Sequence, residues 1–274
     1  MTFDQLQAQL PGQLQPLSPF GLLVQAPPGS DDSIESLAAE ALQPVLLEHR
    51  LVLFRGFRAI DDIDRFGGVC TQWGRLLEWD FGTVFEVVEQ ADPGNYLFTS
   101  GSVPYHWDGA FAEEVPWLQM FHCREAPGED VGGETLFCDT VALWESLTPE
   151  TRLQWESVEI EYSTDKVAHY GGKIRARLVD RHPRTGETVI RFAEPANATT
   201  VQLNTPELEV EGIPADSVPG FLNELTRLIY DPRFVYSHCW QPGDFLVADN
   251  HVLLHARTKY LQNQPRRLWR VHVL

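Results

Sequence analysis

The residues of this chain best suited to chemistry are His106 and Asp108, which flank Trp107. In a β-strand, residues two apart point to the same face, so His106 and Asp108 would lie together while Trp107 packs on the other side. Two histidines and one carboxylate on one face of Fe(II) leave the opposite face open for a co-substrate and O2. A His-x-Asp pair alone is a weak signal, because a histidine at a strand end beside a hydrogen-bonded aspartate looks the same.

The second histidine of such a set has two candidates, His251 and His255. They lie four residues apart in a largely apolar segment and therefore share one strand face, so the chemistry alone does not choose between them. Arg266 follows His255 by eleven residues, which leaves room for a short loop and the start of a returning strand.

That returning strand carries an unusual pair of cations, because Arg266 and Arg270 share one face with Leu268. Arg267 is the arginine expected to point outward. Two arginines on a half-apolar face are costly to bury unless they meet anions. A dicarboxylate co-substrate and an anionic substrate would supply those anions.

With these residues in place, the chain resembles the taurine dioxygenase/TfdA family of Fe(II)- and 2-oxoglutarate-dependent oxygenases. The resemblance implies that His106, Asp108 and His255 bind iron, and it favours His255 over His251. It also implies that Thr135 and Arg266 hold the distal carboxylate of 2-oxoglutarate and that Arg270 meets an anionic group of the substrate. The matching segments cover most of the chain and include Leu53-Phe54-Arg55-Gly56-Phe57, His106/Asp108, Gly132-Gly133-Glu134-Thr135-Leu136, Arg181-His182-Pro183-Arg184-Thr185-Gly186, Ala248-Asp249-Asn250, His255 and Arg266/Arg270.

Within that family, the chain is most similar to the oxygenases of isocyanide biosynthesis, of the paerucumarin and rhabduscin kind. The matching segments include Val103-Pro104-Tyr105-His106-Trp107-Asp108-Gly109, Ile190-Arg191-Phe192-Ala193-Glu194-Pro195 and Arg267-Leu268-Trp269-Arg270-Val271-His272. The resemblance implies desaturation or oxidative decarboxylation of an amino-acid-derived isocyanide to a vinyl isocyanide. Two alternatives stay open: a hydroxylase of a free or carrier-tethered amino acid, and a metal-free jelly-roll binding module.

The composition of the chain limits the kinds of partner that it can bind. The net charge of −18 argues against nucleic acid and anionic membranes, and no window is apolar enough for a membrane span. Four scattered cysteines without a C-x-x-C pair argue against a disulfide framework. The expected location is therefore a reducing cytoplasm. The expected partner is a small amino-acid-derived substrate, while a carrier protein and a homo-oligomer stay open.

The pattern of elements predicts one domain over residues 1–274, mainly β with flanking helices. We expect helices over about 31–49, 60–73 and 219–230, and strands near 51–54, 95–99, 104–111, 117–123, 134–138, 158–163, 188–193, 234–239, 244–249, 252–257 and 267–273. Short strands at this spacing suggest a sandwich or jelly roll, which the resemblance sharpens to a double-stranded β-helix.

One segment departs from the acidic background, since residues 163–191 carry seven lysines and arginines. Three interpretations fit it: a solvated loop face, a lid insertion around 163–188 over the iron site, and a docking patch for an acidic carrier protein.

Overall fold

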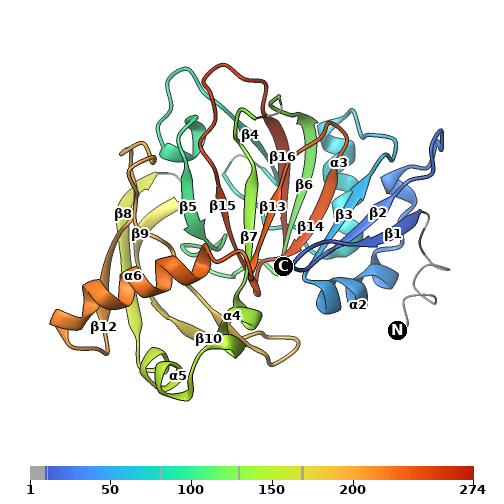
Figure 1. The fold of residues 1–274 in the computed structure, drawn as a ribbon. Helices are drawn as coiled ribbons and strands as arrows, with labels where there is room; N and C mark the ends of the chain where they lie inside the picture. The colour runs from blue at the N-terminus through green and yellow to red at the C-terminus, as the bar shows by residue number, and fades with distance from the viewer. Residues whose placement is uncertain (1–9, 11, 81, 129, 168–169) are drawn as a thin grey trace.

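Two β-sheets face each other in the computed structural model, which describes residues 10, 12–80, 82–128, 130–167 and 170–274 (Figure 1). The larger sheet has the strand order β1-β2-β3-β14-β6-β16-β4, and the smaller has the order β13-β7-β15-β5. Neighbouring strands are antiparallel except β2 and β3. The larger sheet consists of β1 (Gln13–Pro16), β2 (Leu22–Gln25), β3 (Leu51–Arg55), β4 (Val84–Val88), β6 (Leu118–Glu125), β14 (Phe245–Asp249) and β16 (Arg267–Val273). The smaller consists of β5 (Val103–His106), β7 (Thr135–Asp139), β13 (Val235–His238) and β15 (Leu253–Arg257).

The central strands are buried on both faces, which explains their nearly unbroken apolar sequence. In β3, Leu51 and Leu53 join the core between the two sheets, whereas Val52 and Phe54 face the helices outside the larger sheet. Because side chains alternate along each strand, the same parity decides which residues of the other strands point inward.

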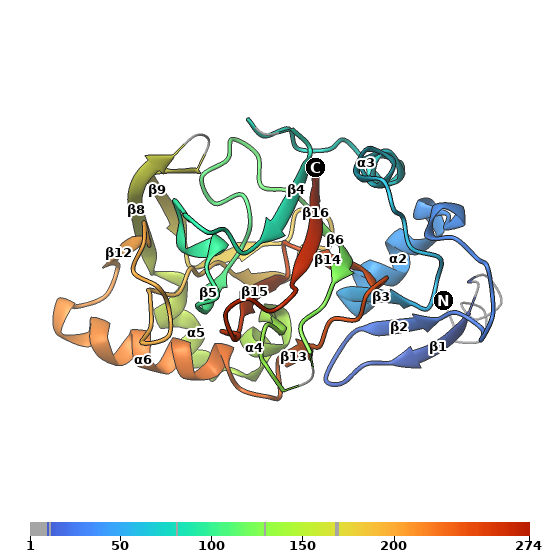
Figure 2. The same ribbon diagram turned by 90° about the horizontal axis from the view of Figure 1, so that it is seen from above.

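Helices cover the outer faces of both sheets. α2 (Ala39–His49) and α3 (Ile63–Cys70) lie beside the N-terminal strands, at the end of the molecule away from β8 and β9 (Figure 2). α4 (Thr140–Ser146), α5 (Pro149–Glu156) and α6 (Val218–Ile229) pack against the smaller sheet. In the part of the chain that the structure describes, four 3-10 turns complete the helical elements: η1 (Ile34–Ser36), η2 (Thr71–Trp73), η3 (Tyr96–Phe98) and η4 (Ala215–Ser217). No helix among the described residues is long and apolar enough to cross a membrane.

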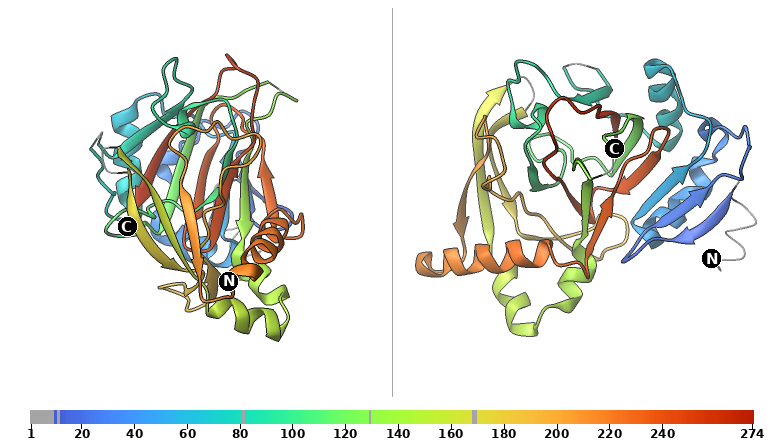
Figure 3. Two further views of the ribbon diagram at one scale, coloured as in Figure 1. Left: turned by 90° about the vertical axis from the view of Figure 1, so that its left-hand side faces the viewer. Right: turned by 45° about the horizontal axis from the view of Figure 1, so that its top comes forward.

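The segment expected to be a lid is built largely of strands. β8 (Glu159–Val167), β9 (Tyr170–Arg177) and β12 (Glu207–Glu211) form a third sheet of order β12-β8-β9, and β10 (Val179–Arg181) pairs with β11 (Thr188–Ile190). The hairpin of β8 and β9, drawn in yellow, stands at the side of the molecule away from the N-terminal strands (Figure 3).

Three local expectations were wrong. The predicted strand 95–99 is the 3-10 turn η3, because Asn95 caps it by accepting a hydrogen bond from the Leu97 amide. The predicted helix 31–49 is split into η1 and α2, with Ser33 rather than an aspartate capping η1. The strand predicted over 104–111 ends at His106, which leaves Asp108 in the turn that follows.

Candidate active site

His106, Asp108 and His255 meet between the two sheets. One possible ligand atom from each lies within 4.8 Å of the others. His106 ends β5, and His255 lies opposite it on the neighbouring strand β15, so their ring centroids are 4.1 Å apart. His106 Nε2 lies 3.6 Å from Asp108 Oδ1, and His255 Nε2 lies 3.8 Å from Oδ2. The possible metal-ligating atoms of all three residues therefore point toward one another.

Strand alternation explains part of this convergence. Tyr105 points into the core cluster under α4 and α6, so His106, the last residue of β5, points inward. Asp108 lies in the turn after the strand, and contacts with Asn250, Arg270 and His272 hold it beside His106. Leu253 belongs to the core between the sheets, and His255 shares its face two residues later.

His251 belongs to a different cluster. Its Nδ1 accepts a 2.6 Å hydrogen bond from Arg191, and its ring packs edge-on against His182. Burial and the neighbouring Arg191 charge lower the pKa of His251 to about 3. Of the two candidate histidines, His255 is the one that the structure brings to His106 and Asp108.

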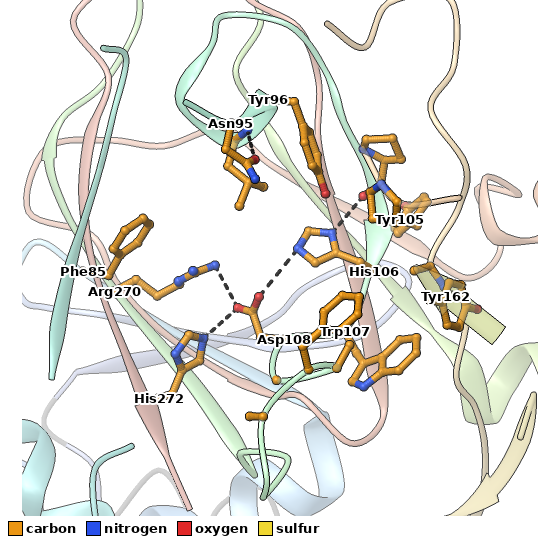
Figure 4. Close-up of a pocket in the computed structure, with 18 of the residues that line it drawn as sticks. Phe85, Asn95, Tyr96, Tyr105, His106, Trp107, Asp108, Tyr162, Arg270 and His272 are labelled. Carbon is orange, nitrogen blue, oxygen red and sulfur yellow. Dashed lines mark hydrogen bonds and ion pairs between the residues drawn. The ribbon is translucent and has the colours of Figure 1, made fainter. Parts of the chain in front are cut away.

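The carboxylate of Asp108 is held from one side by two donors on β16. Its Oδ2 accepts hydrogen bonds from Arg270 Nη1 at 2.8 Å and from His272 Nε2 at 2.7 Å, and Figure 4 shows both side chains converging on it. Burial by itself would raise the pKa of Asp108, but the charge of Arg270 and the nearby histidines outweigh it and hold that pKa well below its ordinary value. Asp108 is therefore a carboxylate at neutral pH.

The main chain next to the ligands is fixed by Asn250. Its Oδ1 accepts from the Asp108 amide at 2.9 Å, and its Nδ2 donates to the Asp108 carbonyl at 3.0 Å. The same Oδ1 accepts from Gln119 Nε2, which also lies 3.1 Å from His255 Nδ1. Asn250 thus connects the backbone of one prospective ligand to the ring of another.

Arg266 lines a cavity of about 50 Å³ that is also lined by His106 and His255. It is buried, and its Nε donates to the Gly133 carbonyl while Nη2 lies 3.4 Å from Thr135 Oγ1. Among the described residues no carboxylate lies within ion-pairing distance of Arg266. Burial, with the charge of Arg257 nearby, lowers the pKa of Arg266 to about 9. A buried cation in this state favours an incoming anion.

Thr135 is placed to assist. Its Oγ1 also accepts a hydrogen bond from Trp240 Nε1 at 2.9 Å. Because the hydroxyl oxygen is occupied by donors, its own proton remains for an acceptor in the cavity.

A second cavity, of about 240 Å³, opens on the other side of His106 and Asp108. Asn95 and Tyr96 project into it from the wall opposite Asp108, as seen in Figure 4. Arg270 lines both cavities and lies over the ring of Phe85. The aromatic side chains that line the larger cavity are Trp79, Phe85, Tyr96, Phe98, Tyr105, Trp107, Phe111 and Tyr162.

The basic segment has two kinds of cation. Lys173 and Arg175 form ion pairs with Glu161 and Glu211 within the third sheet, whereas Arg191 is buried beside His251. Tyr162 of β8 and Pro206, just before β12, line the larger cavity, so this sheet contributes to the cavity wall.

The sequence analysis missed several residues of the site. His272 was assigned no role, yet it follows Arg270 by two residues on β16, and strand alternation places both on the inner face. Asn250 and Gln119 had no comparable signal, because their role depends on strands that meet only in the fold. Arg267 points outward, as predicted, and pairs with Glu86.

Comparison with known proteins identifies the class. The family model "Taurine catabolism dioxygenase TauD, TfdA family" matches residues 13–272. The chain therefore belongs to the TauD/TfdA dioxygenase family.

Its relatives include enzymes of isocyanide metabolism. It is 48% identical over 258 residues to the 3-((Z)-2-isocyanoethenyl)-1H-indole synthase of Fischerella ambigua, covering 94% of each chain. It is 36% identical to the tyrosine isonitrile desaturase of Pseudomonas aeruginosa, covering 93% of this chain and 87% of that one. The crystal structure of PvcB from Pseudomonas aeruginosa superposes with a TM-score of 0.82 at 33% identity, over 96% of this chain and 92% of that one. PvcB is described as an Fe, alpha-ketoglutarate dependent oxygenase from an isonitrile synthetic pathway.

Proposed function

We propose that this protein is an Fe(II)- and 2-oxoglutarate-dependent oxygenase that oxidises an amino-acid-derived isocyanide to a vinyl isocyanide. The observation that carries the proposal is the position of the His106/Asp108/His255 cluster. It borders a small cavity lined by the buried Arg266, which has no ion-pair partner among the described residues, and a larger cavity lined by aromatic residues. The similarity to the isocyanoethenyl-indole synthase and the tyrosine isonitrile desaturase supports the choice of substrate.

The residues of the cluster fit a divalent iron. His106 Nδ1 lies 2.9 Å from the Pro104 carbonyl, which can only accept, so the ring donates there and directs Nε2 toward Asp108. With the proton at Nδ1, the lone pair of Nε2 and the Asp108 carboxylate would both be satisfied by a cation bound between them. His106, Asp108 and His255 would hold that cation, the set preferred by Fe(II) in non-heme oxygenases.

Gln119 bears on how His255 would bind. Among the described residues its buried Oε1 has no hydrogen-bond partner, whereas its Nε2 lies against His255 Nδ1. A half-turn of this amide would let Oε1 accept a hydrogen bond from the N–H at Nδ1 and leave the lone pair of His255 Nε2 for the metal. The turn would give up the hydrogen bond that Nε2 donates to Asn250 Oδ1.

Arg266 and Thr135 are proposed to hold the distal carboxylate of 2-oxoglutarate. The guanidinium supplies a planar fork and the hydroxyl a further donor. Thr135 lies two residues along β7 from Phe137, which pairs with His255, so a carboxylate held there would leave the keto-acid end of the co-substrate to reach the cluster.

The iron, when bound, supplies the activation of O2. One O2 takes up four electrons, two from the oxidation of 2-oxoglutarate to succinate and CO2, and two from the substrate. The substrate loses either two hydrogens or one hydrogen together with its carboxylate as CO2, and water carries the hydrogens away. Arg270 would orient the substrate carboxylate, so that the reacting C–H faces the cluster.

The wall of the larger cavity favours an aromatic side chain on the substrate, because flat rings pack well against the surrounding aromatic faces and exclude water. The third sheet would act as part of the enclosure, since it contributes Tyr162. It is the element that we propose as the lid on a single domain spanning residues 1–274.

We also assign the two facing sheets to a double-stranded β-helix. The support is their antiparallel pairing around a shared core, with the prospective ligands and both arginines on inner faces. The likeness to PvcB over nearly the whole chain agrees with this assignment.

The test is anaerobic loading with Fe(II) and 2-oxoglutarate, followed by O2, with the isocyanides of tryptophan and tyrosine and the parent amino acids as separate substrates. Mass spectrometry should show an isocyanide that has lost two hydrogens, or hydrogen and CO2, with one succinate per product. Gain of one oxygen on an amino acid, free or carrier-bound, would instead establish the hydroxylase. Absence of both metal binding and succinate would indicate a binding module.

A further inference from the structure

We propose that Trp79 and His272 are positioning residues that fix which oxygen of Asp108 faces the metal. The inference rests on the proposed function, since it takes the His106/Asp108/His255 cluster as the metal site. His272 Nε2 lies 2.7 Å from Asp108 Oδ2, and His272 Nδ1 lies 3.1 Å from Trp79 Nε1. The three side chains form a hydrogen-bonded chain from the wall of the larger cavity to the carboxylate.

The direction of this chain follows from Trp79. An indole N–H only donates, so His272 Nδ1 must accept. A neutral imidazole that accepts at Nδ1 carries its proton at Nε2 and donates from there to Asp108. Trp79 therefore selects the tautomer of His272 that can hold a carboxylate.

The consequence for Asp108 is an asymmetric carboxylate. Oδ2 accepts two hydrogen bonds, from His272 and Arg270, and lies 3.8 Å from His255 Nε2, whereas Oδ1 lies 3.6 Å from His106 Nε2. Two donors on Oδ2 leave Oδ1 as the stronger ligand and oppose rotation of the group. Both donors line the larger cavity, but Arg270 also lines the smaller one, whereas His272 Nε2 is engaged by Asp108 and its Nδ1 by Trp79.

The fold anchors both members of the pair. His272 is buried on β16, where it lies opposite Gln119 of β6. The loop that carries Trp79 is attached to the end of the same strand, because the Leu77 amide donates to the His272 carbonyl and Leu76 bridges to Val273. The rings of Trp79 and His272 meet edge-to-face at 5.4 Å.

The experiment measures Co(II) binding to the purified apoprotein, by calorimetric titration and by the visible absorption bands of the bound ion. Four variants are compared with wild type. His272→Leu removes the donor to Asp108, His272→Gln replaces it with an amide donor, and Trp79→Phe removes the N–H that selects the tautomer while keeping a smaller aromatic ring. Trp269→Phe is the matched control: it removes the same kind of N–H, here donated to Glu86, from the same strand but on its outer face.

We expect His272→Leu to weaken Co(II) binding by about 10- to 100-fold, the usual cost of losing a group that orients a ligand, and to shift the visible bands. Trp79→Phe should move both readings in the same direction by less, His272→Gln should recover most of the loss, and Trp269→Phe should match wild type. Thermal melts of the apoproteins identify any variant that fails to fold. If His272→Leu does not fold, the comparison of Co(II) binding by Trp79→Phe and by Trp269→Phe tests the inference instead.

Wild-type affinity and bands in both Trp79→Phe and His272→Leu would overturn the inference. So would a His272→Gln protein as weak as His272→Leu, or an equal loss in Trp269→Phe. If wild type itself binds no metal, the proposed function fails and the inference fails with it. Tight binding by wild type with silent variants refutes the positioning role alone.

Discussion

Two clusters in this protein each contain two histidines and an aspartate, yet they are built in opposite ways. In the second cluster, Asp249 accepts four hydrogen bonds: Trp117 and His182 donate to Oδ2, and the amides of His251 and Val252 donate to Oδ1. Arg191 donates to His251, and two backbone amides donate to His182 Nδ1. Each lone pair in these contacts already has a protein donor.

The His106/Asp108/His255 cluster has the same residue types, but its possible metal-ligating atoms are directed at one another. Only the sides turned away from the centre are satisfied, by Pro104, Gln119, Arg270 and His272. The difference shows that composition does not make a metal site. A site requires lone pairs that the protein orients but does not itself satisfy.

The test with the largest expected effect replaces the three residues of the first cluster and one histidine of the second. We expect His106→Ala, Asp108→Ala and His255→Ala each to abolish Fe(II)-dependent succinate formation, whereas His251→Ala keeps substantial turnover. Succinate assays and metal titrations check this. Loss of metal binding in His251→Ala with retention in His255→Ala would reverse the roles of the two clusters.

The buried arginines offer the next contrast. Arg266→Lys should raise the KM for 2-oxoglutarate strongly, because an ammonium cannot reproduce the planar fork, at a cost of about 1.5–3 kcal/mol. Arg191→Lys in the second cluster is the matched control and should lower stability while leaving that KM in place. An unchanged KM in Arg266→Lys would remove this arginine from the co-substrate site.

Arg270 sharpens the comparison, because it contacts Asp108 and also faces both cavities. Arg270→Ala should uncouple the reaction, so that succinate forms without stoichiometric oxidation of the substrate. An analogue without a carboxylate should lose less than the parent acid does. Equal losses for both would place the substrate carboxylate elsewhere.

The smallest expected effect is on the pH dependence of protein stability, through His251 of the second cluster. Burial, then the charge of Arg191, lowers the pKa of His251 to about 3 from 6.5. Below the ordinary value the unfolded chain binds a proton that the folded chain does not. The free energy of unfolding therefore has its full value above the ordinary pKa of histidine. It declines by up to about 1.4 kcal/mol per pH unit as the pH falls toward the folded-state pKa of His251.

Replacing this histidine isolates its contribution. His251→Gln should flatten the decline in unfolding free energy between about pH 7 and about pH 5, measured by urea denaturation. Parallel pH profiles for the variant and wild type would show that His251 does not contribute to the acid sensitivity.

Much of the chemistry was determined by the sequence alone. The pattern that singled out His106, Asp108, Arg266 and Arg270 is local, because it needs only residues two or four apart in one segment. His106 and Arg270 lie in β5 and β16 as expected, whereas Asp108 and Arg266 lie just outside these strands. The family, the reaction class and the dependence on Fe(II) and 2-oxoglutarate, all taken from a resemblance carried by such motifs, were confirmed by the comparisons. The substrate side chain, the lid and the role of each site residue stay predictions.

The resemblance favoured His255 over His251, and only the tertiary structure shows which of the two lies beside His106. Both lie near one another in the chain, and only the β15–β5 register brings His255 to His106, while Arg191 comes from a distant segment to occupy His251. The same holds for Trp79, which reaches His272 across 193 positions of sequence. Long-range pairings of this kind depend on which strands become neighbours, and no local pattern in a single chain specifies that.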